Sequence, residues 1–452
     1  MTRRIILGLL LVLCVLSVVF VAVAWRTAIA PVDPPARPTF DTALIARGAS
    51  LAAIGDCVSC HTAPKGKPYA GGFPLHTQFG TIYGTNITPD AETGIGRWTL
   101  PAFSRAMHEG VDREGRHLYP AFPYDHFTNV SDDDIQALYA FFMTREPVRA
   151  QTPPNDLTFP LNFRMLIAAW KLLYLESTGF RPDPAQSGDW NRGAYLVRGL
   201  GHCGACHTPR NALGAEKREL DLGGGEAEGW HAPALNAATH APIPWTADAL
   251  LRYLRRGADE THDTAIGPMA AVVNNLSAVP ESEVRGIATY IASVMGPADE
   301  QRQKRASQIV AKARGANEAS GSVPEVQRQD AKKSDLAPQN NAAAIYAGSC
   351  AMCHVALERP AGSASGNALH LGLSTTLSLP TPANLIRVIL QGIAPADGER
   401  GSNMPGYAGA FTDAQVGALV SYLRATYTDR PEWTDVDRQV RKARQSFAEA
   451  PE

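Results

Sequence analysis

Three copies of the frame Cys-x-x-Cys-His constrain the fold of this chain more than any other feature of its sequence. The frames begin at Cys57, Cys203 and Cys350, so consecutive copies stand 146 and 147 positions apart. Two nearly equal spacings with matching flanks indicate a threefold internal repeat. Because 452 residues are too many for a single core, we expect one domain per repeat.

Each repeat has the same order of expected elements. A short helix precedes the cysteines, a stretch rich in Gly and Pro follows them, and two further helices end the repeat. The last helix carries apolar side chains on one face, and no segment alternates with a period of two, so the sequence predicts an all-α fold. The expected helices are 42–53, 98–110 and one from 131; 190–199, 245–257 and one from 280; and 342–347, 381–392 and one from 412.

Composition divides the chain between these repeats. Residues 161–175 are apolar but interrupted by Arg164 and Lys171, which favours a helix between domains over a second membrane span. Residues 298–341 are polar and mixed in charge, which indicates a flexible or weakly helical linker. The expected domains are 1–30 (membrane anchor or signal peptide), 40–148 (first domain), 149–189 (interdomain helix or linker), 190–297 (second domain), 298–341 (flexible linker), 342–430 (third domain) and 431–452 (C-terminal tail).

The N-terminal apolar run indicates export of the chain. Residues 5–25 are uncharged and follow Arg3 and Arg4. About 20 helical residues cross a bilayer, whereas a signal peptide has an apolar region of about 7–15, so the length favours an uncleaved anchor with the arginines in the cytoplasm. Ala28-Ile29-Ala30 resembles a cleavage site, so a cleaved signal is the alternative. Cys14 is expected to be a lipid-facing apolar residue of this run.

The histidine in each frame indicates a haem. Cys-x-x-Cys alone fits half a zinc site or a redox dithiol, but each repeat lacks a second cysteine pair for zinc and a preceding strand for a dithiol. Two thioether bonds and an adjacent imidazole are what a c-type haem requires. The sequence therefore predicts three covalently bound haem c groups, one in each of three tandem cytochrome c-like domains behind the N-terminal transmembrane or signal helix. The expected attachment residues are Cys57, Cys60, Cys203, Cys206, Cys350 and Cys353, and the expected proximal iron ligands are His61, His207 and His354.

The sixth iron ligand differs between the repeats. Met269 and Met404 each stand beside Pro in a loop before the last helix, and a Met thioether raises the potential and closes the iron to outside ligands. At the matching place the first repeat has Phe122, which cannot coordinate iron. The candidates for the first haem are Met107, His126, the neighbouring His108 and His117, another ligand, or an open site.

Three stretches carry a resemblance to a known family. They begin Gly80-Thr-Ile-Tyr-Gly-Thr-Asn-Ile-Thr-Pro, His117-Leu-Tyr-Pro-Ala and Cys206-His-Thr-Pro-Arg-Asn-Ala-Leu-Gly-Ala. Residues 40–430 resemble the triheme cytochrome c subunit of bacterial membrane-bound dehydrogenases, which serves alcohol, gluconate, sorbitol, fructose and aldehyde dehydrogenases. The stretch Ala121-Phe-Pro-Tyr-Asp-His-Phe-Thr is more similar to cytochromes that accompany molybdenum hydroxylases, such as nicotinate, isoquinoline or aldehyde dehydrogenases.

The resemblance implies a function, a set of partners and a location. A separate catalytic subunit of the flavin, quinoprotein or molybdenum type would oxidise the substrate. This chain would pass the electrons through its haems to ubiquinone or a terminal oxidase. It would lie on the periplasmic side of the bacterial cytoplasmic membrane, anchored at its N-terminus.

No catalytic residue is visible in the sequence, so we expect an electron-transfer subunit that is not catalytic alone. The acidic run 132–134 is explained as a helix start. A multihaem enzyme with an open first haem, peroxidase-like or thiosulfate-oxidising, is the alternative, and a haem-bearing domain of an oxidase is a third. The net charge of −2 gives no sign of a nucleic-acid partner.

Overall fold

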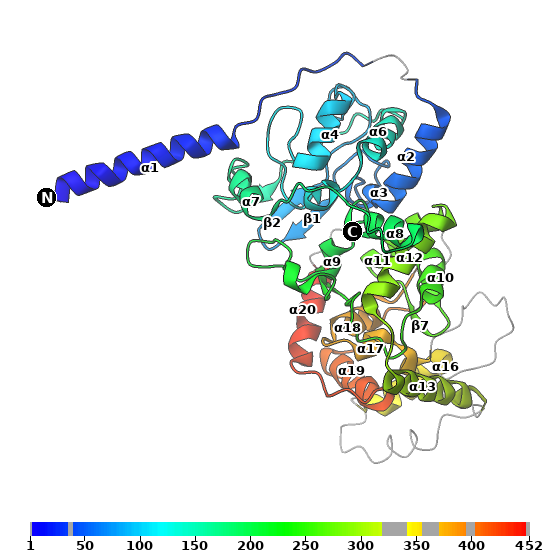
Figure 1. Ribbon diagram of the computed structural model, residues 1–452. Coiled ribbons are helices and arrows are strands. Elements are labelled where there is room, and N and C mark those ends of the chain that lie inside the picture. Colours follow the sequence, from blue (N-terminus) through cyan, green and yellow to red (C-terminus); the bar gives the residue numbers. More distant parts are fainter. Residues whose placement is uncertain (1, 35–38, 319–340, 355–369, 395–402, 449–452) are drawn as a thin grey trace. The chain divides into compact units, whose positions relative to one another are not determined.

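The structure is a computed structural model, and it describes residues 2–34, 39–318, 341–354, 370–394 and 403–448 (Figure 1). By its internal contacts the chain divides into two compact units. The N-terminal unit holds Met1–Ala205 and Arg210–Glu216, and the C-terminal unit holds Cys206–Pro209 and Lys217–Glu452. Because the division falls inside the second repeat, the expected boundaries of three domains stay a prediction.

Helix α1 (Thr2–Ala24) projects from the N-terminal unit (Figure 1). Its apolar side chains are exposed, Leu9 and Leu11 each by 66%, and Cys14 is exposed among them. Among the described residues, Arg3–Ala24 is the one stretch long and apolar enough to cross a membrane. An apolar helix that no core covers fits both an anchor and a signal segment.

The rest of the N-terminal unit is built on helices α2 (Thr42–Ile54) and α6 (Asp132–Met143), which pack against each other. Gly48 permits their close crossing, because a Cβ at this position would lie 2.0 Å from the carbonyl oxygen of Ala137. Ser131 caps α6 by accepting a hydrogen bond from a backbone N–H of its first turn. The buried core around this crossing includes Leu51, Phe103, Met107, Ile135, Leu138, Phe141 and Phe142.

Helix α4 (Leu100–Glu109) covers this core and ends at Gly110, whose φ of 61° places it in the left-handed region that glycine tolerates. Thr99 caps its N-terminus. The other helices of this unit are α3 (Cys57–Cys60), α5 (Tyr124–Phe127), α7 (Leu166–Tyr174) and α8 (Gly188–Arg198), and α9 (Gly204–His207) begins in it.

The C-terminal unit is also mainly helical. Helix α10 (Ala247–Arg256) packs against α11 (Pro268–Ser277) and α12 (Glu281–Met295), and α19 (Asp413–Tyr427) packs against α15 (Ala342–Ser349). The remaining elements are η1 (Arg218–Leu220), α13 (Glu300–Glu318), α16 (Ala351–His354), η3 (Leu371–Leu373), α17 (Thr375–Ser378), α18 (Ala383–Gln391) and α20 (Val436–Ala448).

Each helix expected in the repeats is present, with ends within two residues of the expected ones. The expectation of an all-α fold is wrong in detail, because short antiparallel strands accompany the helices. With at most four residues each, they are too short to show a repeating pattern. The strands are β1 (Pro74–Thr77), β2 (Gly80–Tyr83) and β3 (Asp156–Leu157) in one sheet, β4 (Gly225–Ala227) with β5 (Trp230–Ala232), and β6 (Ala258–Asp259) with β7 (His262–Thr264).

Three segments between or after the repeats form helices that pack against a core. The start of the expected flexible linker forms α13, which buries Ala306 against Ile243 and Leu373, while residues 319–340 of that linker lie outside the described residues. The expected C-terminal tail forms α20, which buries Val440 in the core of α18 and α19. The expected interdomain helix is α7, and its inner face packs within the N-terminal unit.

Candidate haem sites

The first Cys-x-x-Cys-His frame lies directly after α2. Asp56, with a φ of 48°, turns the chain from α2 into the short helix α3, which holds both cysteines. Cys57 packs against the core of the N-terminal unit, and burial, with the charges of Asp56 and Cys60, raises the pKa of its thiol to about 12. Both cysteines of the frame are therefore held on one short helix beside this core.

A β-hairpin fixes the orientation of His61. Its ring Nδ1 donates a hydrogen bond of 2.6 Å to the carbonyl oxygen of Thr85, which follows β2. Burial lowers the pKa of His61, partly offset by this bond, so the ring is neutral at pH 7. A neutral imidazole whose Nδ1–H is held by a carbonyl keeps Nε2 available for a metal. Gly84 lets the hairpin approach, because a Cβ there would lie 1.8 Å from the carbonyl oxygen of Cys60.

The second frame repeats this arrangement. The Nδ1 of His207 donates a hydrogen bond of 2.6 Å to the carbonyl oxygen of Pro233, which follows β5. Burial lowers the pKa of His207 as well, partly offset by that bond. A Cβ on Gly225, at the start of β4, would lie 2.4 Å from the carbonyl oxygen of Cys206. Neither hairpin was predicted from the sequence, although each one orients the histidine of its repeat.

The third frame is described only in part. Cys350 packs against the core formed by α18, α19 and α20, and burial, followed by the charge of Cys353, raises the pKa of its thiol to about 11. His354 ends α16. The chain that follows, residues 355–369, lies outside the described residues, so this repeat offers no comparison of the hairpin.

The donor set of the frames fits a covalently bound haem better than zinc. Within the described ranges, only Asp125, His126 and Glu216 form a group of three or more His, Cys, Asp or Glu side chains close enough to hold a metal ion. No Cys of the frames belongs to that group, whereas a structural zinc site needs four converging ligands. Two cysteines next to a histidine that is held for ligation through Nε2 are what thioether attachment and proximal ligation require.

The structure equates Phe122 with Met269. The carbonyl oxygen of Gly110, at the end of α4, accepts a hydrogen bond of 2.7 Å from Leu118 N, and Phe122 stands four residues later. Gly257 ends α10 in the same way and accepts a bond of 2.6 Å from Ala265 N. Met269 stands four residues after Ala265, half-buried at the start of α11. The absence of a Met from this position in the first repeat is therefore a real difference between equivalent sites.

Met404 occupies a different place. Its backbone pairs with Ile393, directly after Gly392 at the end of α18, through N–H to carbonyl bonds of 2.8 and 2.9 Å. In the first two repeats the residues that take part in the equivalent backbone pairing are His117 and Thr264. His117 precedes Phe122 in the sequence, and Thr264 precedes Met269. Met404 is half-buried, and it stands at the paired position itself and not after it.

The histidines proposed for the first haem are engaged elsewhere. The Nε2 of His126 lies 2.8 Å from Glu216 Oε1, and its Nδ1 lies 3.1 Å from the carbonyl oxygen of Arg198. His108 Nε2 donates to the carbonyl oxygen of Val130 at 2.8 Å. These bonds hold the ring nitrogens of His126 and one of those of His108.

His117 and Met107 complete the set of candidates. His117 Nε2 donates to the carbonyl oxygen of Ala24 at 2.8 Å, and its Nδ1 accepts from Lys171 Nζ at 3.1 Å. Met107 is 6% exposed in the core against which Cys57 packs. It is the one named candidate for the first haem whose side chain lies inside that core.

Glu216 is a functional candidate that was not predicted from the sequence. Burial raises its pKa, but the hydrogen bond and charge of His126 outweigh burial and hold the pKa below its usual value. Burial lowers the pKa of His126, and the bond and charge of Glu216, with the charge of Asp125, outweigh it and raise that pKa. His126 and Glu216 are 90 positions apart in the sequence, so no local sequence pattern predicts that they form a pair.

The segments that precede the first two frames touch each other within the N-terminal unit. The Nε2 of His202 donates to the carbonyl oxygen of Gly55 at 3.2 Å. A Cβ on Gly55 would lie 3.2 Å from the side chain of Leu200 and 3.3 Å from Cys57 Sγ. The start of the second frame, at Cys203, therefore follows a segment that contacts the start of the first.

Two family profiles match parts of the chain. The profile described as cytochrome c matches residues 45–146, and the profile described as cytochrome c oxidase, cbb3-type, subunit III matches residues 337–423. These ranges coincide with the first and third repeats.

Full-length relatives cover almost the whole chain. It is 34% identical to the fructose dehydrogenase cytochrome subunit of Gluconobacter japonicus, over 90% of this chain and 85% of that protein. It is 35% identical to the gluconate 2-dehydrogenase cytochrome c subunit of Pantoea cypripedii, over 85% of this chain and 86% of that one. It is 43% identical over 92% of its length to a nicotinate dehydrogenase subunit of Pseudomonas putida, but spans only 33% of that longer protein.

Proposed function

Because the chain belongs to the cytochrome c subunits of bacterial dehydrogenases, we propose that it carries three haem c groups and relays electrons from a dehydrogenase catalytic subunit to an acceptor in the membrane. The observation that carries the proposal is the matched pair of carbonyl-held histidines, His61 and His207, each next to its own Cys-x-x-Cys pair. When bound, a haem iron supplies one-electron oxidation and reduction.

The chain's residues would bind and tune these groups. Cys57 and Cys60, Cys203 and Cys206, and Cys350 and Cys353 would form the thioether bonds, and His61, His207 and His354 would be the proximal ligands. Met269 and Met404 would close the second and third sites, and Met107 is our candidate for the first. Thr85 and Pro233 hold the first two imidazoles in a fixed tautomer, which keeps the proximal ligand in place.

The contact between His202 and Gly55 supports a relay. It brings the segments before the first two frames within hydrogen-bond distance, so Cys57 and Cys203 each follow one of two touching segments of the N-terminal unit. Burial, followed by the charge of His126, lowers the pKa of His202 to about 4, so its ring is neutral and adds no charge beside the first frame.

The partners follow from the resemblance. The donor would be a catalytic subunit of the flavin, quinoprotein or molybdenum type, and the stretch around Phe122 favours the molybdenum type. The acceptor would be ubiquinone or a terminal oxidase. Helix α1 would anchor the chain so that its domains lie on the periplasmic side of the cytoplasmic membrane.

The proposal is tested by reoxidation of the reduced chain. The full-length protein is reduced anaerobically and mixed with a soluble ubiquinone analogue, and the haem absorbance is followed in time. We expect all haems to be reoxidised, and the variant His207→Ala to leave part of the absorbance reduced. A chain that ubiquinone does not oxidise, but that turns over peroxide with a cyanide-sensitive haem, would be an enzyme and not a relay to quinone.

A further inference from the structure

Helix α7 has two apolar faces, and only one of them is covered. Ile167, Ala168 and Trp170 are buried, with the indole N–H of Trp170 donating to the carbonyl oxygen of Leu213 at 3.0 Å. On the opposite face Leu172 is 70% exposed. The exposed apolar residues of α7 and of the turn before it, which we call the apolar patch, are Phe159, Phe163, Met165, Leu166, Leu172 and Leu173.

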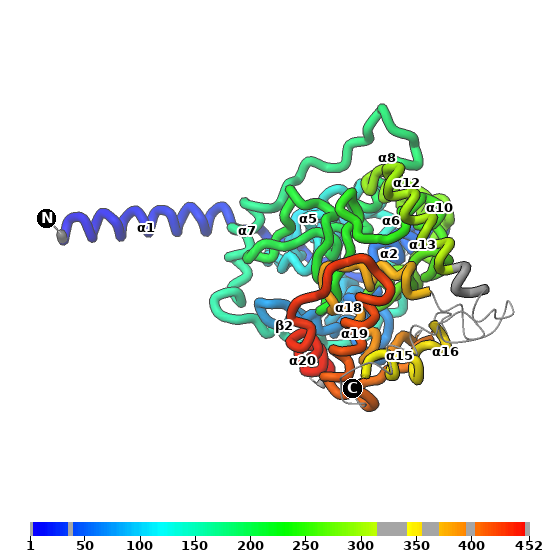
Figure 2. Tube along the Cα trace, turned by 90° about the horizontal axis from the view of Figure 1, so that it is seen from below, coloured from blue at the N-terminus to red at the C-terminus, as the bar shows by residue number. Residues whose placement is uncertain are grey.

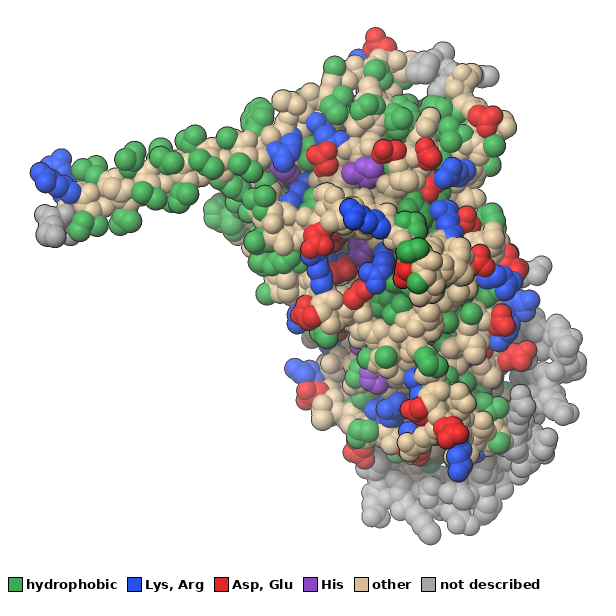
Figure 3. All heavy atoms as spheres, in the orientation of Figure 1, with side chains coloured by type: hydrophobic (Ala, Val, Ile, Leu, Met, Phe, Trp, Pro, Cys, Tyr) green, Lys and Arg blue, Asp and Glu red, His purple; other side chains and the backbone are tan. Residues whose placement is uncertain are grey.

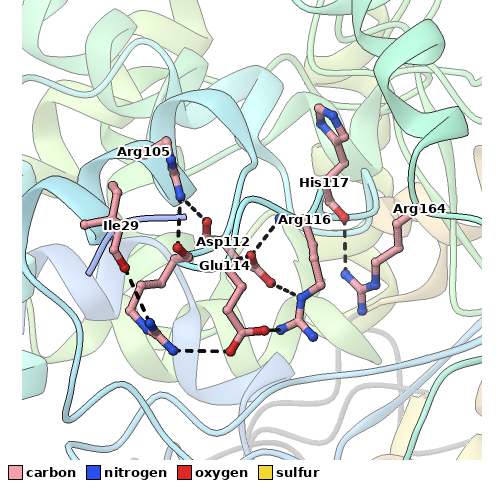
Figure 4. Close-up of polar contacts among 8 residues, drawn as sticks. Ile29, Arg105, Asp112, Glu114, Arg116, His117 and Arg164 are labelled. Carbon is pink, nitrogen blue, oxygen red and sulfur yellow. Dashed lines mark hydrogen bonds and ion pairs between the residues drawn. The ribbon is translucent and has the colours of Figure 1, made fainter. Parts of the chain in front are cut away.

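The two cations that interrupt this sequence point away from the patch. Arg164 Nη1 donates to the carbonyl oxygen of His117 at 3.2 Å (Figure 4), and its guanidinium lies 5.0 Å from the ring centre of Tyr119. Lys171 is 9% exposed and donates to the carbonyl oxygens of Glu109 and Gly110 at 2.6 and 2.7 Å. The outward face of α7 therefore carries no charge, which is unusual for a surface helix in water.

The same loop that holds Arg164 and Lys171 also holds the end of α1. The ring of His117 links Lys171 Nζ to the carbonyl oxygen of Ala24, the last residue of that helix. Farther along, Ile29 N donates to the carbonyl oxygen of Arg113 at 2.8 Å. The apolar patch and the end of α1 are thus fixed to one piece of backbone.

Polar contacts strengthen this attachment. Arg105 Nη1 donates to the carbonyl oxygen of Thr27 at 2.7 Å. Arg113 donates a hydrogen bond to the carbonyl oxygen of Ile29 and pairs with Glu114. Glu114 pairs in turn with Arg116, as Figure 4 shows. The chain leaving α1 therefore has a defined path over the N-terminal unit.

The patch continues the apolar surface of α1. Figures 1 and 2 show α7 beside the end of α1 from two directions, and Figure 3 shows hydrophobic side chains covering the surface where the helix meets the body of the protein. Trp25, 64% exposed, follows the last residue of α1, where aromatic residues mark a membrane–water interface.

We propose that the apolar patch is a second membrane contact, which lies within the lipid headgroup and upper acyl region beside the point where α1 leaves the bilayer. The proposal rests on α1 being a membrane anchor. An uncharged helix face that adjoins a membrane span fits lipid better than a protein partner, because interfaces with other subunits usually add a polar rim. With two points of attachment, the first haem domain keeps a fixed face toward the bilayer.

Photocrosslinking of the full-length chain in its native membrane, with its other subunits present, tests the proposal. The photoreactive amino acid p-benzoylphenylalanine replaces Leu172 or Leu173 in the patch, Leu10 in α1, or Asp133, an exposed residue at the start of α6 in the same unit. After irradiation the chain is identified by its covalently bound haem, and the masses of its adducts are measured by mass spectrometry. Asp133 is the matched control, and Leu10 tests the anchor by itself.

We expect phospholipid adducts at Leu172, Leu173 and Leu10 and none at Asp133. Adducts to another protein at Leu172 and Leu173, or no lipid adduct there while Leu10 gives one, would overturn the proposal. A lipid adduct at Leu172 but none at Leu10 would support the patch and overturn the anchoring role of α1, so the two failures are distinguishable.

Discussion

The first and second repeats hold the histidines of their Cys-x-x-Cys-His frames in the same way, but they differ at the position where we propose the sixth iron ligand. His61 and His207 each donate Nδ1–H to a carbonyl oxygen that follows a hairpin, at 2.6 Å in both. At the equivalent distal position one repeat has Phe122 and the other Met269. In our proposal, attachment and distal ligation are therefore set by separate segments, and one can change while the other is kept.

The largest expected effect comes from the hairpins. In Gly84→Ala the new Cβ would overlap the carbonyl oxygen of Cys60, 1.8 Å away, and Gly225→Ala would crowd Cys206 less severely at 2.4 Å. We expect Gly84→Ala to lose the first haem and Gly225→Ala to lose part of the second, measured as haem per polypeptide. Gly188→Ala, which meets no atom within 4 Å, is the control, and full haem content in Gly84→Ala would contradict the role of the hairpin.

Removal of the distal ligand should change spin state without loss of haem. We expect Met269→Leu to convert the second haem from low to high spin and to lower its potential, because thioether ligation is lost at nearly constant side-chain volume. The visible spectrum and a redox titration measure both changes. Met295→Leu, a buried substitution in α12 of the same unit, should leave them unaltered. If Met269→Leu has the spectrum of the parent chain, Met269 is not a ligand.

The reverse substitution tests whether the two distal positions are equivalent. Phe122→Met places a thioether where the second repeat has Met269. In a chain that also carries Met107→Leu, which removes our candidate ligand, we therefore expect Phe122→Met to add a Met–iron charge-transfer band to the visible spectrum. Phe127→Met, which replaces the ring that packs edge-on against Phe122 at 5.2 Å, is the control. A Phe122→Met chain without the added band would mean that the first site is built differently beyond this one residue.

The smallest expected effect concerns the pair of His126 and Glu216, which joins the first repeat to the chain that follows the second frame. Because the pKa of His126 is raised, its protonation stabilises the fold fully below the usual pKa of His, and this stabilisation is lost as pH rises through the raised pKa. Because the pKa of Glu216 is lowered, its ionisation stabilises the fold fully above the usual pKa of Glu, and this stabilisation is lost as pH falls through the lowered pKa. The full contribution is therefore present between pH 4.5 and pH 6.5, the ordinary pKa values of Glu and His.

Glu216→Gln should remove about 2 kcal/mol from the free energy of unfolding in that window, the usual worth of a hydrogen bond between charged groups. The measurement is denaturant unfolding of the N-terminal unit, followed by its tryptophan fluorescence, as a function of pH. Asp156→Asn, at an exposed position of β3 in the same unit, is the control. An equal loss at pH 5.5 and pH 9 would mean that the contact does not depend on the two charges.

The helices could be predicted from the sequence because each has a local signal. Thr99 and Gly110 mark the two ends of α4, and Thr246 and Gly257 mark those of α10. The alignment of Phe122 with Met269, predicted from spacing to the last helix, is confirmed by the equivalent hydrogen bonds at the two glycines.

The parts that could not be predicted depend on contacts between distant residues. The bond between His61 and Thr85 joins positions 24 apart through a hairpin too short to have a pattern, and that between His126 and Glu216 spans 90. Asp134, interpreted as a helix-start residue, is 1% exposed and accepts a bond of 2.7 Å from the hydroxyl of Tyr195. A single sequence carries the residues of such contacts but not their pairing.

The number of haems is the central claim, and intact-mass measurement of the mature, full-length chain tests it most directly. We predict the mass of the polypeptide plus three covalently bound haems, with two in Cys350→Ser/Cys353→Ser. A mass equal to that of the bare polypeptide, or one that increases only by bound zinc, would contradict the account.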